Sequence, residues 1–525
     1  MNAKRLLCIL LVSSAPLLLR AQRMEQLTRE NPFSTGRNIC GQATLATASY
    51  AEIYTGTEQG GFRPGYSSSD IWRAGARAAT RGYFGDTFLL GRFGFEQMHG
   101  KDMMTSMFIN PGYYPVDVLE FTPGDKTLQT YSFSGGLSYQ LTGRLSLGAL
   151  VDFKAQNYSK RKDIRHTNYG LDLSFVPSVL YHVRRHNCGL SLVLRETAES
   201  IEAEQVGAAT ADTYYAFFDK GLRYGTWQAW DGSGIHLAES GVGRLPVREY
   251  SYGGALQYCY TGKDLSLYAD GEYLRTSGLV GEKGYDWYRF PGNKVAANLI
   301  LSHVISPMLS GRFSFRFDLR GQRVEEAAWD RVTTGGVTVP EVYGYNTVSR
   351  RRHASFTPVY QLRFRDNTVR SLRLGYMAVV MDEQASPLYP CTDRWHAVLS
   401  RANVAAVTGL PFDGALASRF SLTLGARLLW ANDSSDGLQP AIPDAGEGSA
   451  LQPAAEPFRL VSDWVRKREY MTSGAWGLDA GVTYQLAALR GMYLGLDISW
   501  THAFVIENLL GKNRWTAALR LGYDF

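Results

Sequence analysis

The sequence has little charge and no long apolar stretch. Charged residues make up 20% of the 525 residues, below the roughly 25% that soluble proteins usually contain. Beyond residue 22 there is no run of the about eighteen apolar residues that a membrane-spanning helix needs. The mean hydropathy is −0.20, too low for a bundle of such helices. These deficits exclude a helical membrane protein and argue against a set of ordinary soluble domains.

Motifs for metal binding and catalysis are also missing. The five cysteines follow no zinc spacing, and the nine histidines are dispersed. There is no Gly-x-Ser-x-Gly elbow, no His-Glu-x-x-His motif and no phosphate-binding loop. Cys188 and Cys259 lie on consecutive expected strands, but their parity places them on opposite faces, which disfavours a disulfide. We predict neither an enzyme nor a bound cofactor or metal, and an outer-membrane enzyme stays the less favoured alternative.

What the sequence does contain is aromatic residues, glycine and alternation. Aromatics make up 13%, and 54 residues are glycine, about a tenth against a usual 7% or so. Apolar and polar residues alternate over segments of about 9 to 14 residues; Phe420, Leu422 and Leu424, for example, alternate with Ser421 and Thr423. Strands of soluble sandwiches usually run about 5 to 6 residues, whereas tilted membrane strands need about 9 to 11. The pattern therefore favours strands that face lipid on one side and water on the other.

The first residues predict export. Lys4 and Arg5 precede a short apolar run that ends near Ala21, which is typical of a secretory signal peptide over residues 1–21. Its removal would leave 52 basic and 49 acidic residues, a net charge of +3 instead of +6. So small a charge gives no support to nucleic-acid binding, and we predict no nucleic-acid partner.

The spacing of the strands predicts a barrel. About eighteen strands are expected from residue 38 onward, the first at 38–51, and short linkers alternate with long ones at 99–130, 199–248 and 432–472. Outer-membrane barrels have even strand numbers, short periplasmic turns and long extracellular loops. We predict an all-β, antiparallel, up-and-down transmembrane barrel of 14 to 20 strands over 38–525. It would follow a short periplasmic segment at 22–37 and lie in the Gram-negative outer membrane.

The C-terminal strand carries an assembly signal. Trp515, Leu519, Leu521, Tyr523 and Phe525 share one face, and the chain ends on that phenylalanine. An amphipathic last strand ending in Phe resembles the signal that the barrel assembly machinery recognises. We therefore predict that machinery as a partner, with Tyr523 and Phe525 as the recognised residues.

Charges are expected on the face turned to the lumen, because the outward face must stay apolar. Mixed signs argue against strong ion selectivity and favour bracing by internal ion pairs over a charged pore, with a water-filled pore as the alternative. Basic runs at 160–162, with Arg165 and His166, and at 350–352, with His353, are expected near outer-leaflet phosphates of lipid and lipopolysaccharide, or simply in solvent. The predicted lumen charges are Asp270, Glu272, Arg316, Asp318, Arg320, Arg373, Arg427 and Arg520.

One long loop, 199–248, is unusually aromatic. Such a cluster would be costly in water unless it packs against something. It is expected either to fold into the barrel mouth as a plug or to dock a partner. Its candidate binding residues are Tyr214, Tyr215, Phe217, Phe218, Trp227 and Trp230.

Three segments carry a family resemblance: NPGYYPVDVLEFTPG (110–124), YSKRKDIRHTNYGLDLSF (158–175) and IEAEQVG (201–207). They are similar to an uncharacterised family of outer-membrane barrels of Bacteroidota. The resemblance covers most of the mature chain and implies fold and location only. A TonB-dependent receptor is disfavoured, because too few residues precede the first strand for a plug domain, while a fatty-acid-transporter-like barrel with a short hatch stays open.

Two function classes remain. The first is a pore or accessory component in uptake across the outer membrane, partly plugged by its own loops. The second is a non-conducting barrel that displays its loops to a surface lipoprotein or an uptake receptor. Whether the lumen is open distinguishes them.

Overall fold

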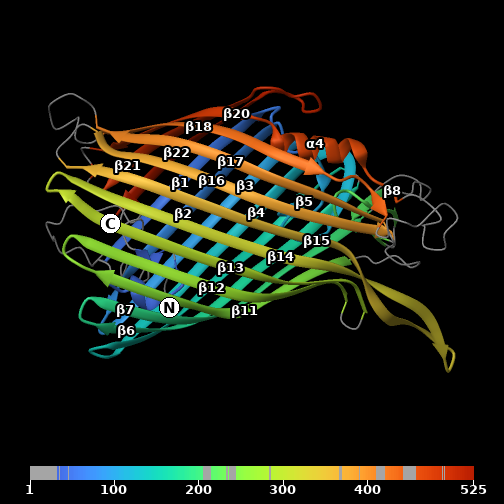
Figure 1. The fold of residues 1–525 in the computed structure, drawn as a ribbon, viewed down its shortest axis with the longest axis horizontal. Coiled ribbons are helices and arrows are strands. Elements are labelled where there is room, and N and C mark those ends of the chain that lie inside the picture. The colour runs from blue at the N-terminus through green and yellow to red at the C-terminus, as the bar shows by residue number, and fades with distance from the viewer. Residues whose placement is uncertain are drawn as a thin grey trace, which may run out of the picture.

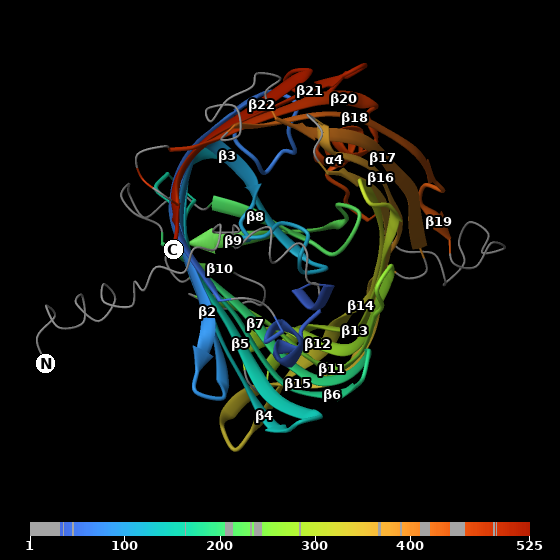
Figure 2. The same cartoon turned by 90° about the vertical axis from the view of Figure 1, so that its left-hand side faces the viewer.

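The chain forms one closed antiparallel sheet, a barrel seen from the side in Figure 1 and from one end in Figure 2. The computed structural model describes all residues except 1–31, 35, 45–46, 163, 205–213, 232–233, 236–243, 283–284, 366–368, 389–390, 410–419, 441–456, 487–488 and 490. Within those described ranges eighteen strands make the barrel wall. The first and last strands pair from Tyr50 opposite Asp524 to Gly60 opposite Arg514, which closes the sheet. The predicted fold is confirmed.

The wall strands run in chain order around the barrel. They are β1 (Ala48–Gly60), β2 (Asp70–Phe84), β3 (Thr87–Ser106), β4 (Asp117–Thr142), β5 (Leu145–Lys160), β6 (Arg165–Val183), β7 (His186–Glu204), β11 (Arg244–Thr261), β12 (Leu265–Glu282), β13 (Tyr285–Ser306), β14 (Leu309–Thr334), β15 (Val337–Phe364), β16 (Val369–Leu388), β17 (Cys391–Thr408), β18 (Phe420–Ser435), β20 (Ala475–Gln485), β21 (Met492–Ala503) and β22 (Asn513–Asp524). The remaining elements are η1 (Pro32–Ser34), α3 (Ile39–Gln42), β8 (Tyr214–Asp219), β9 (Gly225–Asp231), β10 (Gly234–Ile235), β19 (Gln439–Pro440) and α4 (Val461–Thr472).

The outer surface has the apolar character of a lipid-facing band. Leu190, Leu192 and Leu194 on β7 are exposed on this face. Along β6, the exposed Tyr169 and Tyr181 are twelve residue steps apart. At about 3.3 Å a step and a tilt of about 40°, they are separated by roughly 30 Å across the membrane, the thickness of its hydrocarbon core. A closed barrel with such a band is an outer-membrane protein, so the predicted location is confirmed.

Among the described residues, no helix is both long and apolar enough to cross a bilayer.

The strands at the long-loop end are longer than the sequence predicted. The expected loop at 99–130 is largely strand, because β3 continues to Ser106 and β4 begins at Asp117. Alternation of apolar residues marks only the part of a strand that meets lipid, whereas backbone pairing continues beyond it. The expected loop at 432–472 likewise contains helix α4. Its Pro/Gly-rich first part dominated the composition and concealed a short helical segment.

The first predicted strand was placed too early. β1 begins at Ala48, and four of the residues expected at its start, Ile39–Gln42, form α3 instead. We call residues 32–34 and 36–44 the inner segment. It lies inside the barrel near the short-turn end, where Figure 2 shows its two small helices within the ring of strands. Of the periplasmic segment predicted at 22–37, residues 32–34, 36 and 37 belong to the inner segment, and residues 22–31 and 35 lie outside the described ranges.

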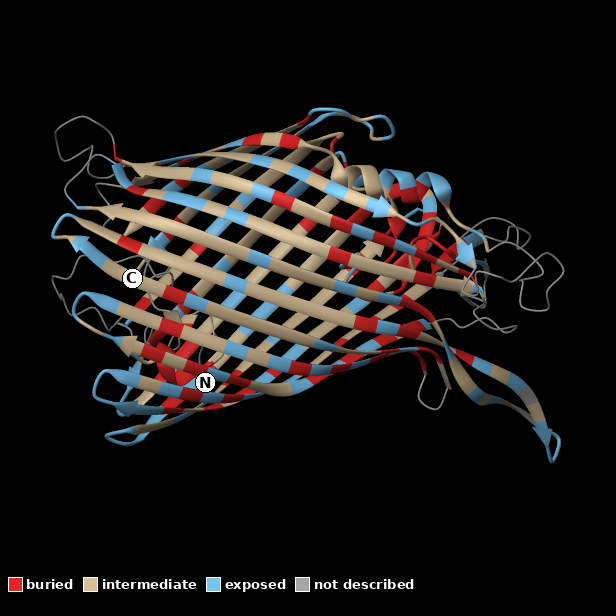
Figure 3. Cartoon of the chain, in the orientation of Figure 1, coloured by how far each residue is buried: buried red, intermediate tan, exposed pale blue. Residues whose placement is uncertain are grey.

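Buried residues gather at two places in the lumen (Figure 3). One core surrounds the inner segment and includes Phe33, Ile39 and Val176. The other lies at the long-loop end and includes Phe108 and Phe218. We call the segments that cover this end the cap: residues 107–116 with the start of β4, residues 214–224, and α4. The lumen therefore holds its own chain at both ends.

Candidate functional site

The inner segment sits in a seat made by glycines of the wall. Cβ atoms added at Gly136 and Gly148 would lie 2.7 and 2.6 Å from Ile39 side-chain carbons, and one at Gly189 would lie 2.7 Å from Asn38 Nδ2. These three glycines belong to β4, β5 and β7. Glycine leaves room for the inner segment at these positions, because any side chain there would collide with it. The sequence showed an excess of glycine but not this role.

Polar contacts fix the orientation of the inner segment. Asn38 caps α3 by accepting from Cys40 N at 3.0 Å, and its Nδ2 donates to the carbonyl of Val179 at 3.0 Å. The guanidinium of Arg37 pairs with Glu272 on β12 at 2.6 Å. One predicted lumen charge thus holds the inner segment, which sequence reasoning did not foresee because the partners are 235 residues apart.

The other predicted lumen charges lie on the inner face of the wall and mostly form ion pairs there. Arg320 pairs with Glu249 at 2.7 Å, and Arg520 pairs with Asp497 at 2.6 Å. Asp270 accepts from Asn298 at 2.9 Å. The rest are Arg427 with Asp479, Arg316 with Asp318, and Arg373 on the lumen side of β16.

The aromatic loop forms a hairpin, β8 and β9, that crosses the barrel mouth (Figure 2). Phe217 and Phe218 are fully buried, and Phe218 stacks on Tyr288 with ring centroids 4.6 Å apart. Tyr214 packs partly against the same core. Tyr215 and Trp227 are exposed, by 57% and 44%. The loop thus has a buried side and an exposed side; for Trp230 the structure gives its pairing opposite Tyr214 and no side-chain environment.

Arg223 ties the three parts of the cap together. Its guanidinium lies 2.6 Å from Asp219 and from Asp463 of α4, and 3.7 Å from Asp117 of β4. Burial alone would lower the pKa of Arg223, but the three carboxylates raise it above its usual value. The arginine therefore stays charged, and the cap is locked by a buried ionic cluster. Sequence reasoning missed it because its members come from three distant segments.

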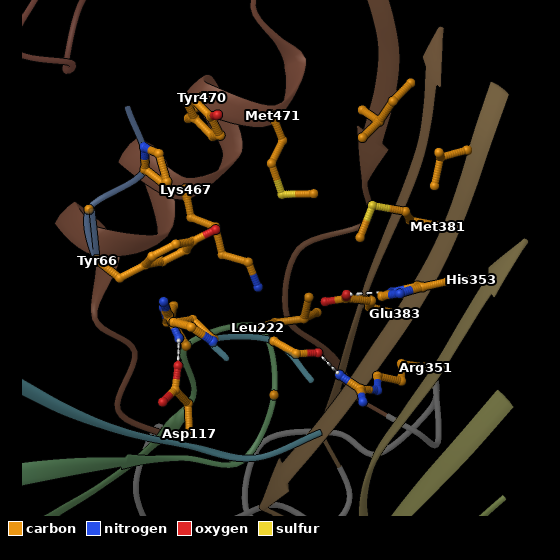
Figure 4. A pocket seen from close by; sticks show the side chains of 18 of the residues that line it. Tyr66, Asp117, Leu222, Arg351, His353, Met381, Glu383, Lys467, Tyr470 and Met471 are labelled. Carbon is orange, nitrogen blue, oxygen red and sulfur yellow. Dashed lines mark hydrogen bonds and ion pairs between the residues drawn. The ribbon is translucent and has the colours of Figure 1, made fainter. Parts of the chain in front are cut away.

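Beneath the cap lies a cavity of about 520 Å³, the cap cavity (Figure 4). Its walls come from β15 to β18, the cap and the loop at 61–69. Met377, Val379 and Met381 of β16 and Leu399 of β17 give it an apolar side. Lys467, Tyr66 and Tyr470 lie on the opposite side in Figure 4. The signal in the sequence was the run from Leu374 to Met381, where alternation gives way to apolar residues on both faces.

A second cavity of about 440 Å³, the central cavity, adjoins the first. It reaches Gly36 and Arg37 of the inner segment. His353 and Val379 line both cavities. His353 Nε2 lies 2.8 Å from Glu383, so this pair stands where the two cavities meet.

The basic runs do not lie as the sequence suggested. Lys160 is buried and pairs with Glu120 at 2.6 Å, and His166 is buried beside Asn168. Arg351 turns inward and donates to the carbonyls of Gly112 and Tyr114. Placing Lys160, His166 and Arg351 near lipid phosphates was therefore wrong. Alternation continues beyond the apolar band, so half of these strand-end charges face the lumen.

The last residues close the barrel seam. Phe525 N donates to the carbonyl of Ser49 at 2.9 Å. Tyr523 and Phe525 are exposed and contact each other, with ring centroids 4.8 Å apart. Their part in assembly remains a prediction.

Comparison with protein families finds one family, and that family has no assigned role. The family model described as "Family of unknown function (DUF6850)" matches residues 41–525. No curated protein matches the chain.

Among solved structures, OccAB3 of Acinetobacter baumannii is 11% identical, with 91% of this chain and 99% of that chain covered and a TM-score of 0.37. The ferric enterobactin receptor PfeA of Pseudomonas aeruginosa is 10% identical, with 91% and 82% covered and a TM-score of 0.38.

Proposed function

The chain belongs to the family of unknown function DUF6850, and we propose that this member is an uptake barrel of the outer membrane whose lumen is closed at rest by its own chain. The inner segment closes the periplasmic half, and the cap closes the extracellular end. Between them the two adjoining cavities form the path that a solute would follow.

The glycine seat is the observation that supports this proposal most strongly. A purely structural barrel can fill its lumen with side chains of the wall. Here Gly136, Gly148 and Gly189 withhold side chains, and a segment outside the barrel wall fills the space instead. An eighteen-stranded barrel is wide enough for a channel once such a filling is removed. A filling that is not part of the wall can leave without unpairing any strand.

Conductance in planar bilayers tests the proposal. The intact protein should show small, poorly selective conductance. A variant in which residues 32–44 are replaced by a Gly/Ser linker should show larger, stable steps. If the barrel assembles and resists heating in detergent like the intact protein, yet its conductance does not rise, the uptake function is wrong.

One observation favours the second candidate, a barrel that displays its loops to a lipoprotein or receptor. Trp227 contacts Phe121 and Phe458, with ring centroids 5.9 and 6.4 Å apart, and all three are exposed in the described part of the chain. Exposed aromatics are typical anchors of interfaces. Co-purification from native membranes after Trp227→Ala tests this candidate. The control is Tyr343→Ala, which removes an exposed aromatic side chain of β15. A partner lost only from the first variant would support docking, and no partner with either the intact protein or the control would refute it.

A further inference from the structure

We propose that the cap cavity is a binding site for an amphipathic anion, a molecule with one anionic head group and an apolar body. The inference rests on the proposed uptake function for its biological meaning, while the binding itself can be tested separately. The apolar body would lie against β16 and β17, and the head group would lie beside Lys467 of α4.

The apolar side of the cavity is unusual for its position. Lumen-facing residues of outer-membrane barrels are ordinarily polar, since they face water or one another. On β16 and β17, Met377, Val379 and Leu399 face the lumen and are only half-buried by the surrounding chain. Their remaining surface lines the cavity. Methionine side chains adapt to the shape of an apolar partner, so this wall suits an alkyl or ring system better than a sugar or an inorganic ion.

The opposite side supplies a positive charge that no carboxylate contacts within 4.0 Å in the described part of the chain. Lys467 points into the cavity in Figure 4. Among the described residues it forms no ion pair within 4.0 Å, and it interacts with Glu383 through the longer-range attraction of opposite charges. The acids around the cavity already contact other cations: three surround Arg223, and Glu383 pairs with His353 while also attracting Lys467.

A second cation adds to this balance. Arg351 reaches the cavity from β15, and within the described ranges its bonds go to backbone carbonyls and Gln322 rather than to a carboxylate. The cavity therefore has a place for one anionic group.

Both halves of the site select the same class of ligand. An uncharged lipid would cover the wall but offer no anionic group to Lys467, and a small hydrophilic anion would leave the wall facing water. The volume of about 520 Å³ falls within the range of pockets for small organic ligands. An amphipathic anion satisfies both sides at once.

Binding of a fluorescent fatty acid tests the inference. The full chain in lipid nanodiscs would be titrated with 11-(dansylamino)undecanoic acid and with its methyl ester, and empty nanodiscs would be subtracted. We expect saturable binding of the acid and about tenfold weaker binding of the ester, the effect of one contact to a charged group. Equal affinity for acid and ester would overturn the inference.

Variants locate the site. Lys467→Met should weaken binding of the acid about tenfold and leave the ester unchanged. Arg466→Met is the matched control, because Arg466 is exposed next to Lys467 and does not line the cavity. Leu399→Asn, or Met377→Gln if that variant assembles poorly, should weaken both probes. Unchanged binding by Lys467→Met, or by the wall variants, would place the probe elsewhere and refute the site.

The outcome is separable from that of the proposed function. Binding of the acid by a protein that never conducts after replacement of the inner segment would keep the site and remove the uptake role. Conductance without specific binding would do the reverse.

Discussion

The two closures of the lumen are built differently. The inner segment is short, lies at the start of the described chain and rests on glycines, and Arg37 with Glu272 is its ion pair at the edge. The cap is threaded between wall strands and is locked by the buried cluster around Arg223. Breaking a buried ionic cluster costs several kcal/mol, whereas a part-exposed ion pair is worth about 1 kcal/mol or less.

The contacts that hold the two closures indicate which of them can leave the lumen at the lower cost. Release of the inner segment breaks apolar packing, the ion pair between Arg37 and Glu272 and hydrogen bonds such as that from Asn38 Nδ2 to the carbonyl of Val179, and the wall stays paired. Release of the cap separates Arg223 from three carboxylates and exposes a core that includes Phe218. We infer that the inner segment is the mobile stopper and that the cap is a fixed cover around the cap cavity. The predictions below run from the largest expected effect to the smallest.

Filling the glycine seat should expel the inner segment. In Gly136→Leu, the new side chain would occupy the space of Ile39, whose carbon lies 2.7 Å from a Cβ placed there. Cys40 is 2% exposed, so its labelling by a water-soluble maleimide should change from slow to rapid, measured in a Cys188→Ser background.

Gly271→Leu is the control for that substitution. No atom lies within 4 Å of a Cβ at Gly271, and this position shares the exposed parity of Tyr273 on the lipid side of β12. Rapid labelling in the control as well, or slow labelling in Gly136→Leu, would contradict the role of the seat.

Removing the central cation should loosen the cap but not the inner segment. Arg223→Met leaves three carboxylates facing one another, at a cost of about 3 kcal/mol. Limited trypsin digestion should then cleave at Arg459 and Lys467, which the intact cap protects, while the barrel keeps its resistance to heating in detergent. Cleavage of the intact protein at the same rate would show that the cluster locks nothing.

Breaking the edge ion pair should have a smaller effect. Glu272→Gln removes the partner of Arg37, a pair that is partly exposed and worth about 1 kcal/mol or less. Maleimide labelling of Cys40 should rise by no more than about fivefold, and 1 M salt should produce a similar rise in the intact protein. A rise as large as that of Gly136→Leu would mean that the ion pair, and not packing, holds the segment.

Changing the last residue should leave both closures as they are. Phe525→Ala is expected to lower the amount of assembled barrel, because the terminal aromatic is the predicted assembly signal. Barrels that do assemble should show unchanged labelling of Cys40 and unchanged trypsin resistance of the cap. Full assembly of the variant, measured by heat-modifiable mobility in gels, would argue against the signal.

Local patterns determined the wall. Alternation such as that at Phe420, Leu422 and Leu424 is dictated within a single strand by the lipid on one side, so fold, strand number and location could be predicted from the sequence alone. The lumen parity of Glu272 and Arg320 followed from the same rule. The first strand was predicted wrongly because α3 is held by contacts to β4, β5 and β6, which no local pattern records.

Tertiary structure decided the lumen. Arg37 pairs with Glu272 of β12, and Arg223 pairs with Asp463 of α4, so both ion pairs join segments that lie far apart in the sequence and meet only in the folded barrel. The same is true of the glycine seat and of the cavity between β16 and α4. Lipid imposes one requirement on every outward residue, so the sequence shows the outside of the barrel plainly. The environment of each inward residue depends on the segment that faces it across the lumen, and the closed fold decides which segment that is.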